Sequence, residues 1–333
     1  MLTELLVSVA IVLGLLGVVF ELVDPAAGTL AVQSLAADLQ QRQRAALAEL
    51  HRHLLLAGGG PHPGTNGIVA HLRPAVAPAL RGMAGDRSPG TDRLSVLYAP
   101  PGESGAQLAS DVAASPATVG LPPAGGCALP CGLSERGGGL ALVFDAAGRS
   151  DLYRITDLTG ATATLEHAAG GGPAYGTGSF IAPVIVRGFH LDRGAEQLRV
   201  HNGAGSDLPF VDGVVEFTVR YFGAPQPALP PPAGPAAVMA PCLAAAAAAA
   251  PVATGVGVLD LGVLADDLSC GGESPFDVDL FRIRRVRVEL TLRVTDPAWR
   301  RPAAASPLAP VRNAAIRDVV VSLDVAPRSL AGW

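Results

Sequence analysis

The sequence predicts an α+β protein in which a long N-terminal helix leads into a β-rich head. Two patterns predict this class. Residues 1–60 carry apolar side chains at helical spacing, whereas residues 61–333 consist of short alternating segments separated by glycine and proline. The chain of 333 residues is long enough for a large head besides a separate N-terminal element. Its 40 Gly and 29 Pro favour β structure with many turns over a helical bundle.

The charge pattern argues against nucleic-acid binding. The net charge is −5, all 24 basic residues are Arg, and no Arg cluster falls on one face of a predicted helix. We therefore expect no nucleic-acid partner.

The chain opens with an uncharged apolar segment, MLTELLVSVAIVLGLLGVVFELVDP. Residues 5–20 carry no charge and are bracketed by Glu4 and Glu21. As a helix this run covers roughly 24 Å, and the apolar residues that flank it extend it to about the thickness of a bilayer core. Residues 1–25 are therefore predicted to form a hydrophobic transmembrane or filament-core helix.

Glu4 is the informative residue of this segment. A signal peptide or an ordinary signal anchor would carry flanking positive charge, but no basic residue precedes Arg42. Neither these two readings nor a buried core helix explains Glu4. A carboxylate deep in hydrocarbon costs about 2.5–3.5 kcal/mol and is tolerated best beside a positive charge, such as the α-amino group of a neighbouring parallel copy. The alternative is that Glu4 lies at headgroup level as a helix-start residue.

The run Leu2-Thr3-Glu4-Leu5-Leu6, followed by Gly14, resembles the N-terminus of type IV pilins and type II secretion pseudopilins. The resemblance implies a leader removed by a prepilin peptidase, an N-methylated first residue, and assembly through Met1 and Glu4. The family's glutamate follows its first mature residue by four positions, whereas Glu4 follows Met1 by three. Met1 is therefore either the mature first residue or the second.

Three residues are expected to weaken this helix. Asp24-Pro25 should interrupt or kink it because proline removes a backbone donor and clashes with the preceding turn. Gly14 and Gly17 are the other predicted helix-break positions.

The helix then resumes as the amphipathic segment 26–60. Its apolar side chains fall three, four or seven apart and form one stripe: Val32, Leu35, Leu39, Ala46, Leu50 and Leu54. Gly58-Gly59-Gly60 before Pro61 ends it. This half is expected to pack one side on the head.

The head is expected to be extracytoplasmic and to contain nine strands, at 94–98, 140–145, 151–156, 161–166, 182–191, 197–201, 214–222, 286–294 and 319–325. In the segment VRVELTLRV, which starts at Val286, alternate residues are apolar and predict a half-buried strand. Residues 223–255 are rich in Pro and Ala and are predicted to be an extended surface excursion between two strands.

The segments GLALVFDAAGRSDLYRITDLTGATATLEH, PFVDGVVEFTVRYFG and RIRRVRVELTLRV resemble the head of PilW-type minor pilins and of J-type minor pseudopilins. This second resemblance implies an antiparallel sheet packed on the second half of the helix. It also implies a minor, priming or tip subunit of a pilus or pseudopilus. The expected partners are other pilin or pseudopilin subunits, the prepilin peptidase, an inner-membrane assembly platform and the inner membrane itself.

The expected location is a single pass through the inner membrane before assembly, then a cell-surface or periplasmic filament. Two alternatives stay open: a major subunit of a pilus-like fibre, and a non-polymerising membrane-anchored extracytoplasmic binding module.

The four cysteines are Cys127, Cys131, Cys242 and Cys270. They are predicted to form disulfides outside the cytoplasm, and proximity favours pairing Cys127 with Cys131 and Cys242 with Cys270, although three pairings are possible. Their spacing does not fit a zinc site.

No catalytic chemistry is predicted. The sequence has no hydrolase elbow, zinc-protease helix, phosphate loop or dinucleotide fingerprint, and its histidines are scattered. Asp266-Asp267 could hold calcium, but the segment lacks the spacing of a calcium loop and is interpreted as a polar turn. We therefore expect no enzyme activity, cofactor or metal.

Overall fold

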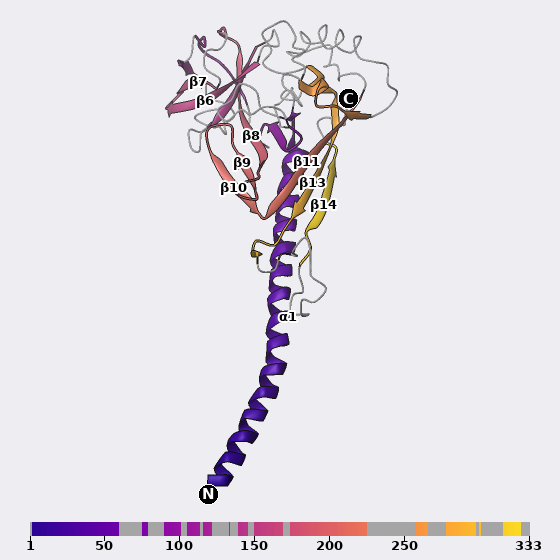
Figure 1. Ribbon diagram of the computed structural model, residues 1–333. Coiled ribbons are helices and arrows are strands. Elements are labelled where there is room, and N and C mark those ends of the chain that lie inside the picture. Colours follow the sequence, from indigo (N-terminus) through magenta and orange to yellow (C-terminus); the bar gives the residue numbers. More distant parts are fainter. Residues whose placement is uncertain are drawn as a thin grey trace.

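The structure is a computed structural model that describes residues 2–59, 75–78, 90–100, 105–113, 116–121, 133, 139–145, 150–168, 174–224, 257–265, 278–297, 300 and 316–327. Helix α1 (Leu2–Leu56) is one long helix whose C-terminal part enters a β-sheet head. Side chains of α1 are described for residues 3–19, 30 and 32–56. Figure 1 shows the N-terminal part of α1 standing clear of the described head.

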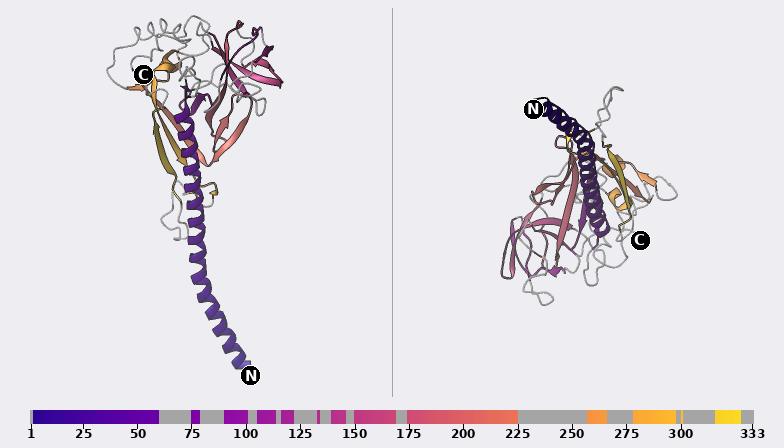
Figure 2. Two further views of the ribbon diagram at one scale, coloured as in Figure 1. Left: turned by 180° about the vertical axis from the view of Figure 1, so that it is seen from behind. Right: turned by 90° about the horizontal axis from the view of Figure 1, so that it is seen from below.

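Helix α1 passes through Gly14, Gly17 and Pro25 without interruption, so the predicted interruption of the helix is wrong. A proline removes one backbone donor, and the hydrogen bonds on either side can carry the helix past it with a bend. Helix α1 curves gently along its N-terminal part (Figure 2). A Cβ built at Gly14 or Gly17 would meet no other atom within 4 Å, so no packing requirement for glycine acts at either position.

The larger sheet has ten strands and is antiparallel throughout. Its main path runs β1-β2-β8-β5-β6-β7-β4, with β3 and β9 also paired to β8 and β10 paired to β9. The bounds are β1 Val76–Ala77, β2 Arg93–Tyr98, β3 Ala106–Gln107, β4 Ala117–Gly120, β5 Leu140–Phe144, β6 Ser150–Thr159, β7 Thr162–His167, β8 Phe180–Asp192, β9 Gln197–His201 and β10 Asp207–Asp212. The 13-residue β8 is the central strand of this sheet, because four other strands pair with it: β2, β3, β5 and β9.

The smaller sheet has four antiparallel strands in the order β12-β11-β13-β14. Its strands are β11 Val214–Gly223, β12 Gly257–Leu259, β13 Ile283–Leu292 and β14 Val319–Val325. As the alternation predicted, Val286, Val288, Leu290, Leu292 and Val294 are all buried. Their neighbours on the other face of β13 are partly exposed.

The predicted fold class, α+β with one antiparallel sheet packed on the helix, is wrong. Strand dominates the described head, which holds 14 strands in two antiparallel sheets. Apart from α1, its helices among the described residues are two short 3-10 turns, η2 (Val263–Ala265) and η3 (Val278–Arg282). The protein is therefore mainly β. Short segments that carry no strong strand signal, such as β3, β4 and β10, add to the larger sheet by pairing with strong neighbours.

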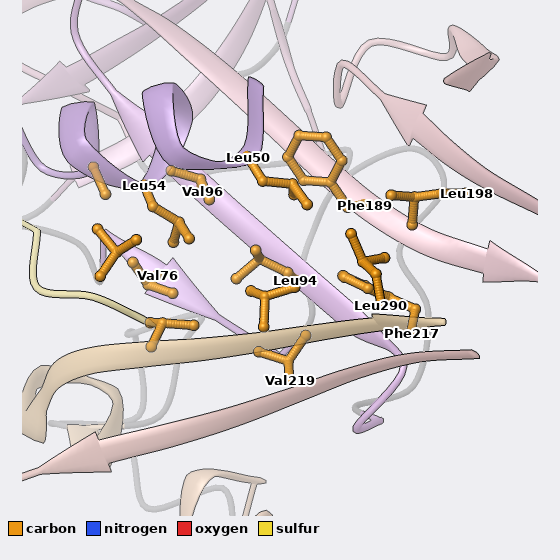
Figure 3. Close-up of a cluster of buried hydrophobic side chains, with 14 of the residues drawn as sticks. Leu50, Leu54, Val76, Leu94, Val96, Phe189, Leu198, Phe217, Val219 and Leu290 are labelled. Carbon is orange, nitrogen blue, oxygen red and sulfur yellow. The ribbon is translucent and has the colours of Figure 1, made fainter. Parts of the chain in front are cut away.

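Both sheets contact the C-terminal part of α1. The helix touches β2 and β10 of the larger sheet and β14 of the smaller one, and in Figures 1 and 2 it runs between the two sheets. The predicted stripe faces this interior, because Leu39, Ala46, Leu50 and Leu54 are buried. Figure 3 shows Leu50 and Leu54 among buried side chains of both sheets. Two further buried clusters lie within the larger sheet.

Within the part of the chain that the structure describes, no helix is both long enough and apolar enough to cross a membrane. The predicted single-pass anchor over residues 1–25 has no support there.

Candidate assembly surface

The most unusual surface of the molecule is the N-terminal part of α1. Every side chain from Thr3 to Val19 is exposed. Eleven of these are large and apolar, and each has between 45% and 64% of its surface exposed. They are Leu5, Leu6, Val7, Val9, Ile11, Val12, Leu13, Leu15, Leu16, Val18 and Val19. We call residues 3–19 of α1 the apolar rod.

Exposed apolar residues on the rod face all directions. Leu5-Leu6-Val7 and Ile11-Val12-Leu13 are consecutive, and consecutive residues of an α-helix point about 100° apart. A helix that is apolar on every side is normally buried on every side, and a contiguous apolar surface of this kind marks an interaction site. A single flat partner would leave part of the rod exposed to water.

Glu4 lies in the first turn of α1 and is exposed at the N-terminal end of the rod. A negative charge there is favourable because it faces the positive end of the helix dipole. Its predicted partner residue, Met1, lies outside the described residues. Cys127, Cys131, Cys242 and Cys270 also lie outside them, as do Asp266, Asp267 and most of the Pro/Ala-rich segment 223–255.

The C-terminal part of α1 is fixed in the head by a buried polar network as well as by its apolar stripe. The imidazole of His53 is buried, with Nδ1 2.9 Å from the Tyr98 hydroxyl and Nε2 2.9 Å from Oε1 of Glu49. A neutral His53 protonated on Nε2 satisfies both contacts, because it donates to the Glu49 carboxylate and accepts from Tyr98.

Burial sets the protonation of this network. Desolvation lowers the pKa of His53 below 6.5; the positive charges of Arg187 and Arg52 add to this effect, and Glu49 opposes it. Desolvation also raises the pKa of Tyr98. Both side chains are therefore neutral at physiological pH. The neighbouring His51 is exposed, as expected for a residue two positions away on a helix.

A second polar cluster, partly buried, lies in the larger sheet. Oδ2 of Asp151 accepts a 2.9 Å hydrogen bond from the Tyr175 hydroxyl, and Oδ1 lies 3.3 Å from Nε2 of His167. Burial, together with the nearby Asp151, raises the pKa of Tyr153 to about 12 and that of Tyr175 further. These groups tie the Tyr175 segment to β6 and β7. Among the described residues no group of three or more His, Cys, Asp and Glu could hold a metal ion.

Sequence reasoning missed two polar side chains that link α1 to the head: His53, which contacts Tyr98, and Arg42, which donates to the backbone oxygen of Asp212 at 2.7 Å. Arg42 carried a signal in the sequence. Arg42 lies three positions after Leu39 and four before Ala46, so it occupies the apolar stripe itself. A charged residue at a stripe position indicates a buried polar partner in the head. The contact of His53 with Tyr98 carries no such local signal, since Tyr98 lies 45 positions further along the chain.

No protein-family model, curated protein or solved structure matches this chain.

Proposed function

We propose that the chain is a filament subunit of the type IV pilin or pseudopilin kind, assembled by packing its apolar rod among the rods of neighbouring subunits. The observation that carries the proposal is the exposure of eleven large apolar side chains on one projecting helix. The described head packs on the C-terminal part of α1 and leaves residues 3–19 exposed.

The energy of association favours several neighbours over one. Burying what remains exposed of a half-exposed Leu or Val contributes about 1 kcal/mol, since full burial contributes about 1.5–3 kcal/mol. Association of two proteins costs about 4–15 kcal/mol in lost freedom. Covering one stripe of the rod leaves most of the eleven side chains exposed, whereas surrounding the rod with parallel helices buries all of them.

Glu4 would set the axial register between the packed helices of neighbouring subunits. A carboxylate taken into an apolar helix bundle is destabilising unless a positive group lies beside it. The α-amino group of a neighbouring subunit is the group that axially shifted parallel packing brings to this position. Register would then be set by Glu4, while the eleven apolar side chains supply affinity without directionality.

The proposed subunit is a minor one, which primes the filament or lies at its tip. The size of the head and the three head segments that resemble PilW-type minor pilins support this assignment. Its partners are other pilin or pseudopilin subunits, and it is processed and assembled by a prepilin peptidase and an inner-membrane platform. The assembled subunit lies in a cell-surface or periplasmic filament.

The test is a pair of matched substitutions in cells that assemble filaments from this chain and its sibling subunits. Leu13→Asp places a charge on the rod, and Leu208→Asp places the same charge on β10 at a comparably exposed leucine, 58% against 63%. We expect Leu13→Asp to remove the chain from the sheared filament fraction and Leu208→Asp to leave it there. Equal recovery of both variants in filaments would contradict the proposal.

A further inference from the structure

Arg42 reaches from α1 to both sheets. Its Nη1 donates to the backbone oxygen of Asp212 at 2.7 Å, at the end of β10, and approaches the backbone oxygen of Arg293 at 3.4 Å, just beyond β13. Its Nε donates to Oδ2 of Asp38 at 2.9 Å, one turn earlier on α1. One guanidinium therefore joins the helix, the larger sheet and the smaller sheet.

The backbone around Arg42 is built for this close approach. Gly213, between β10 and β11, has a φ of 72°, a conformation that favours glycine. A Cβ there would lie 2.4 Å from the Arg293 oxygen and 2.6 Å from Nη1 of Arg42. The Arg293 amide donates to the Gly213 oxygen at 2.7 Å, so the β10–β11 turn is joined directly to the end of β13.

Glu196 joins the two sheets a second time at the same place. It lies in the turn between β8 and β9 with a φ of 50°, the only positive φ among the described residues other than glycine. Its backbone oxygen accepts from the Val214 amide at 2.9 Å. Its carboxylate lies 2.8 Å from Nη2 of Arg300 and 3.4 Å from Nη1 of Arg293. This backbone conformation is uncommon for a residue other than glycine, and the surrounding contacts hold it in place. Such conformations occur often at functional sites.

We infer that Arg42, Glu196, Gly213 and Arg293 form a clasp that fixes the rotation and the axial position of α1 in the head. An apolar stripe alone allows a helix to slide or turn, since apolar contacts are non-directional. Hydrogen bonds from a planar guanidinium are directional and hold one geometry. The clasp lies at the end of the head from which α1 emerges (Figure 1), and Arg42 is placed between Leu39 and Ala46 of the buried stripe.

The consequence for assembly is that the head keeps one orientation on its rod. Helix, larger sheet and smaller sheet then move as one body when the rod packs among its neighbours. This consequence rests on the proposed function. The clasp itself can be tested on the unassembled chain in detergent, so that the clasp and the filament proposal can fail separately.

The first test is amide hydrogen exchange in Arg42→Ala, with Arg44→Ala as the matched control because Arg44 lies two residues on and is exposed. We expect the exchange rates of the Val214 and Arg293 amides to rise about tenfold in Arg42→Ala. The variant loses one charge-assisted hydrogen bond, and such a loss is enough to shift a local opening equilibrium by this factor. Amides in the centre of β13 should not change, and Arg44→Ala should change neither group. A uniform rise over β13, or no rise at Val214 and Arg293, would overturn the inference.

The second test measures the orientation directly. Nitroxide labels introduced as unnatural amino acids at Gln33 on α1 and Val258 on β12 report the distance between helix α1 and the smaller sheet of the head; both positions are exposed. Arg42→Ala should broaden the distance distribution and Arg44→Ala should leave it narrow. If Arg42→Ala does not fold, Asp38→Asn replaces it, since it removes only the ion pair that orients the guanidinium, and a smaller broadening is expected. An unchanged distribution in the folded variant would exclude a clasp.

Discussion

Leu13 and Leu50 belong to the same helix and have opposite environments: Leu13 is 63% exposed and Leu50 is fully buried between the two sheets. The contrast divides α1 into a part that belongs to the head and a part that the described head does not cover. The uncovered part is the more uniformly apolar of the two.

This division predicts different effects of the same substitution. Leu50→Ala should lower the free energy of unfolding of the head by about 2–5 kcal/mol, because it leaves a cavity in the core. Leu13→Ala should change it by less than about 0.5 kcal/mol, because 63% of the Leu13 side chain is exposed. Chemical denaturation of both variants in the unassembled state measures the difference. A large loss of stability in Leu13→Ala would show that the rod folds onto the head.

The stability of the head should depend on pH through His53. The pKa of His53 is lowered in the folded chain by burial, so the unfolded chain binds more protons at acid pH. The contribution of His53 is therefore fully present above the unfolded pKa of about 6.5 and is lost as the pH falls through the lower folded pKa.

Denaturation curves between pH 7.5 and pH 4.5 test this contribution. The range is chosen to bracket a pKa of about 6.5 and its lowered folded value. In His53→Gln, which keeps a polar side chain but does not titrate, the loss of stability towards acid should be smaller than in the wild type. Identical pH profiles for the two proteins would show that His53 does not contribute.

Two aspartates should differ in their effect on stability because one ion pair is buried and the other lies on the surface. Asp279 pairs with Nη1 of Arg282 at 2.9 Å in a buried site, whereas Asp324 pairs with Nη2 of Arg287 at 2.7 Å on the outer face of the smaller sheet. Asp279→Asn should cost about 3 kcal/mol because it leaves a buried guanidinium without its counter-charge. Asp324→Asn should cost less than about 1 kcal/mol. Thermal unfolding of both variants tests the ranking, and equal costs would contradict it.

Removing the charge of Glu4 should impair assembly without affecting the head. Glu4 is exposed in the unassembled chain, so Glu4→Ala and the isosteric Glu4→Gln should leave the unfolding transition unchanged. Both should reduce incorporation into filaments, because register depends on the carboxylate. Quantification of the chain in sheared filaments measures this effect, and normal incorporation of both variants would argue against a register role for Glu4.

Elements with strong local periodicity could be predicted from the sequence. The stripe of α1 and the alternation in β13 are visible because each element buries one face only. All nine predicted strands are present in the structure within a few residues of their predicted bounds. Each of these predictions depends on residues close together in the chain.

Pairing between distant segments could not be predicted in the same way, and the fold class was wrong for that reason. β2 and β13 belong to different sheets, but the residues of these two strands carry no local pattern that would assign them so. β10 contains Pro209, which argues against a strand unless the strand is an edge, and among the described strands β10 pairs only with β9. The contact of Arg42 with Asp212 spans 170 residues and likewise depends on the completed fold.

Photo-crosslinking from the rod tests the central claim most directly. A benzophenone amino acid at Leu13 should crosslink to the α1 rod of another subunit in assembled filaments, identified by mass spectrometry of the crosslinked peptides. The same group at Val320, which is exposed on β14 of the head, should not reach a neighbouring rod. Crosslinks from Leu13 that reach only lipid, or only residues of the same chain, would contradict assembly through the rod.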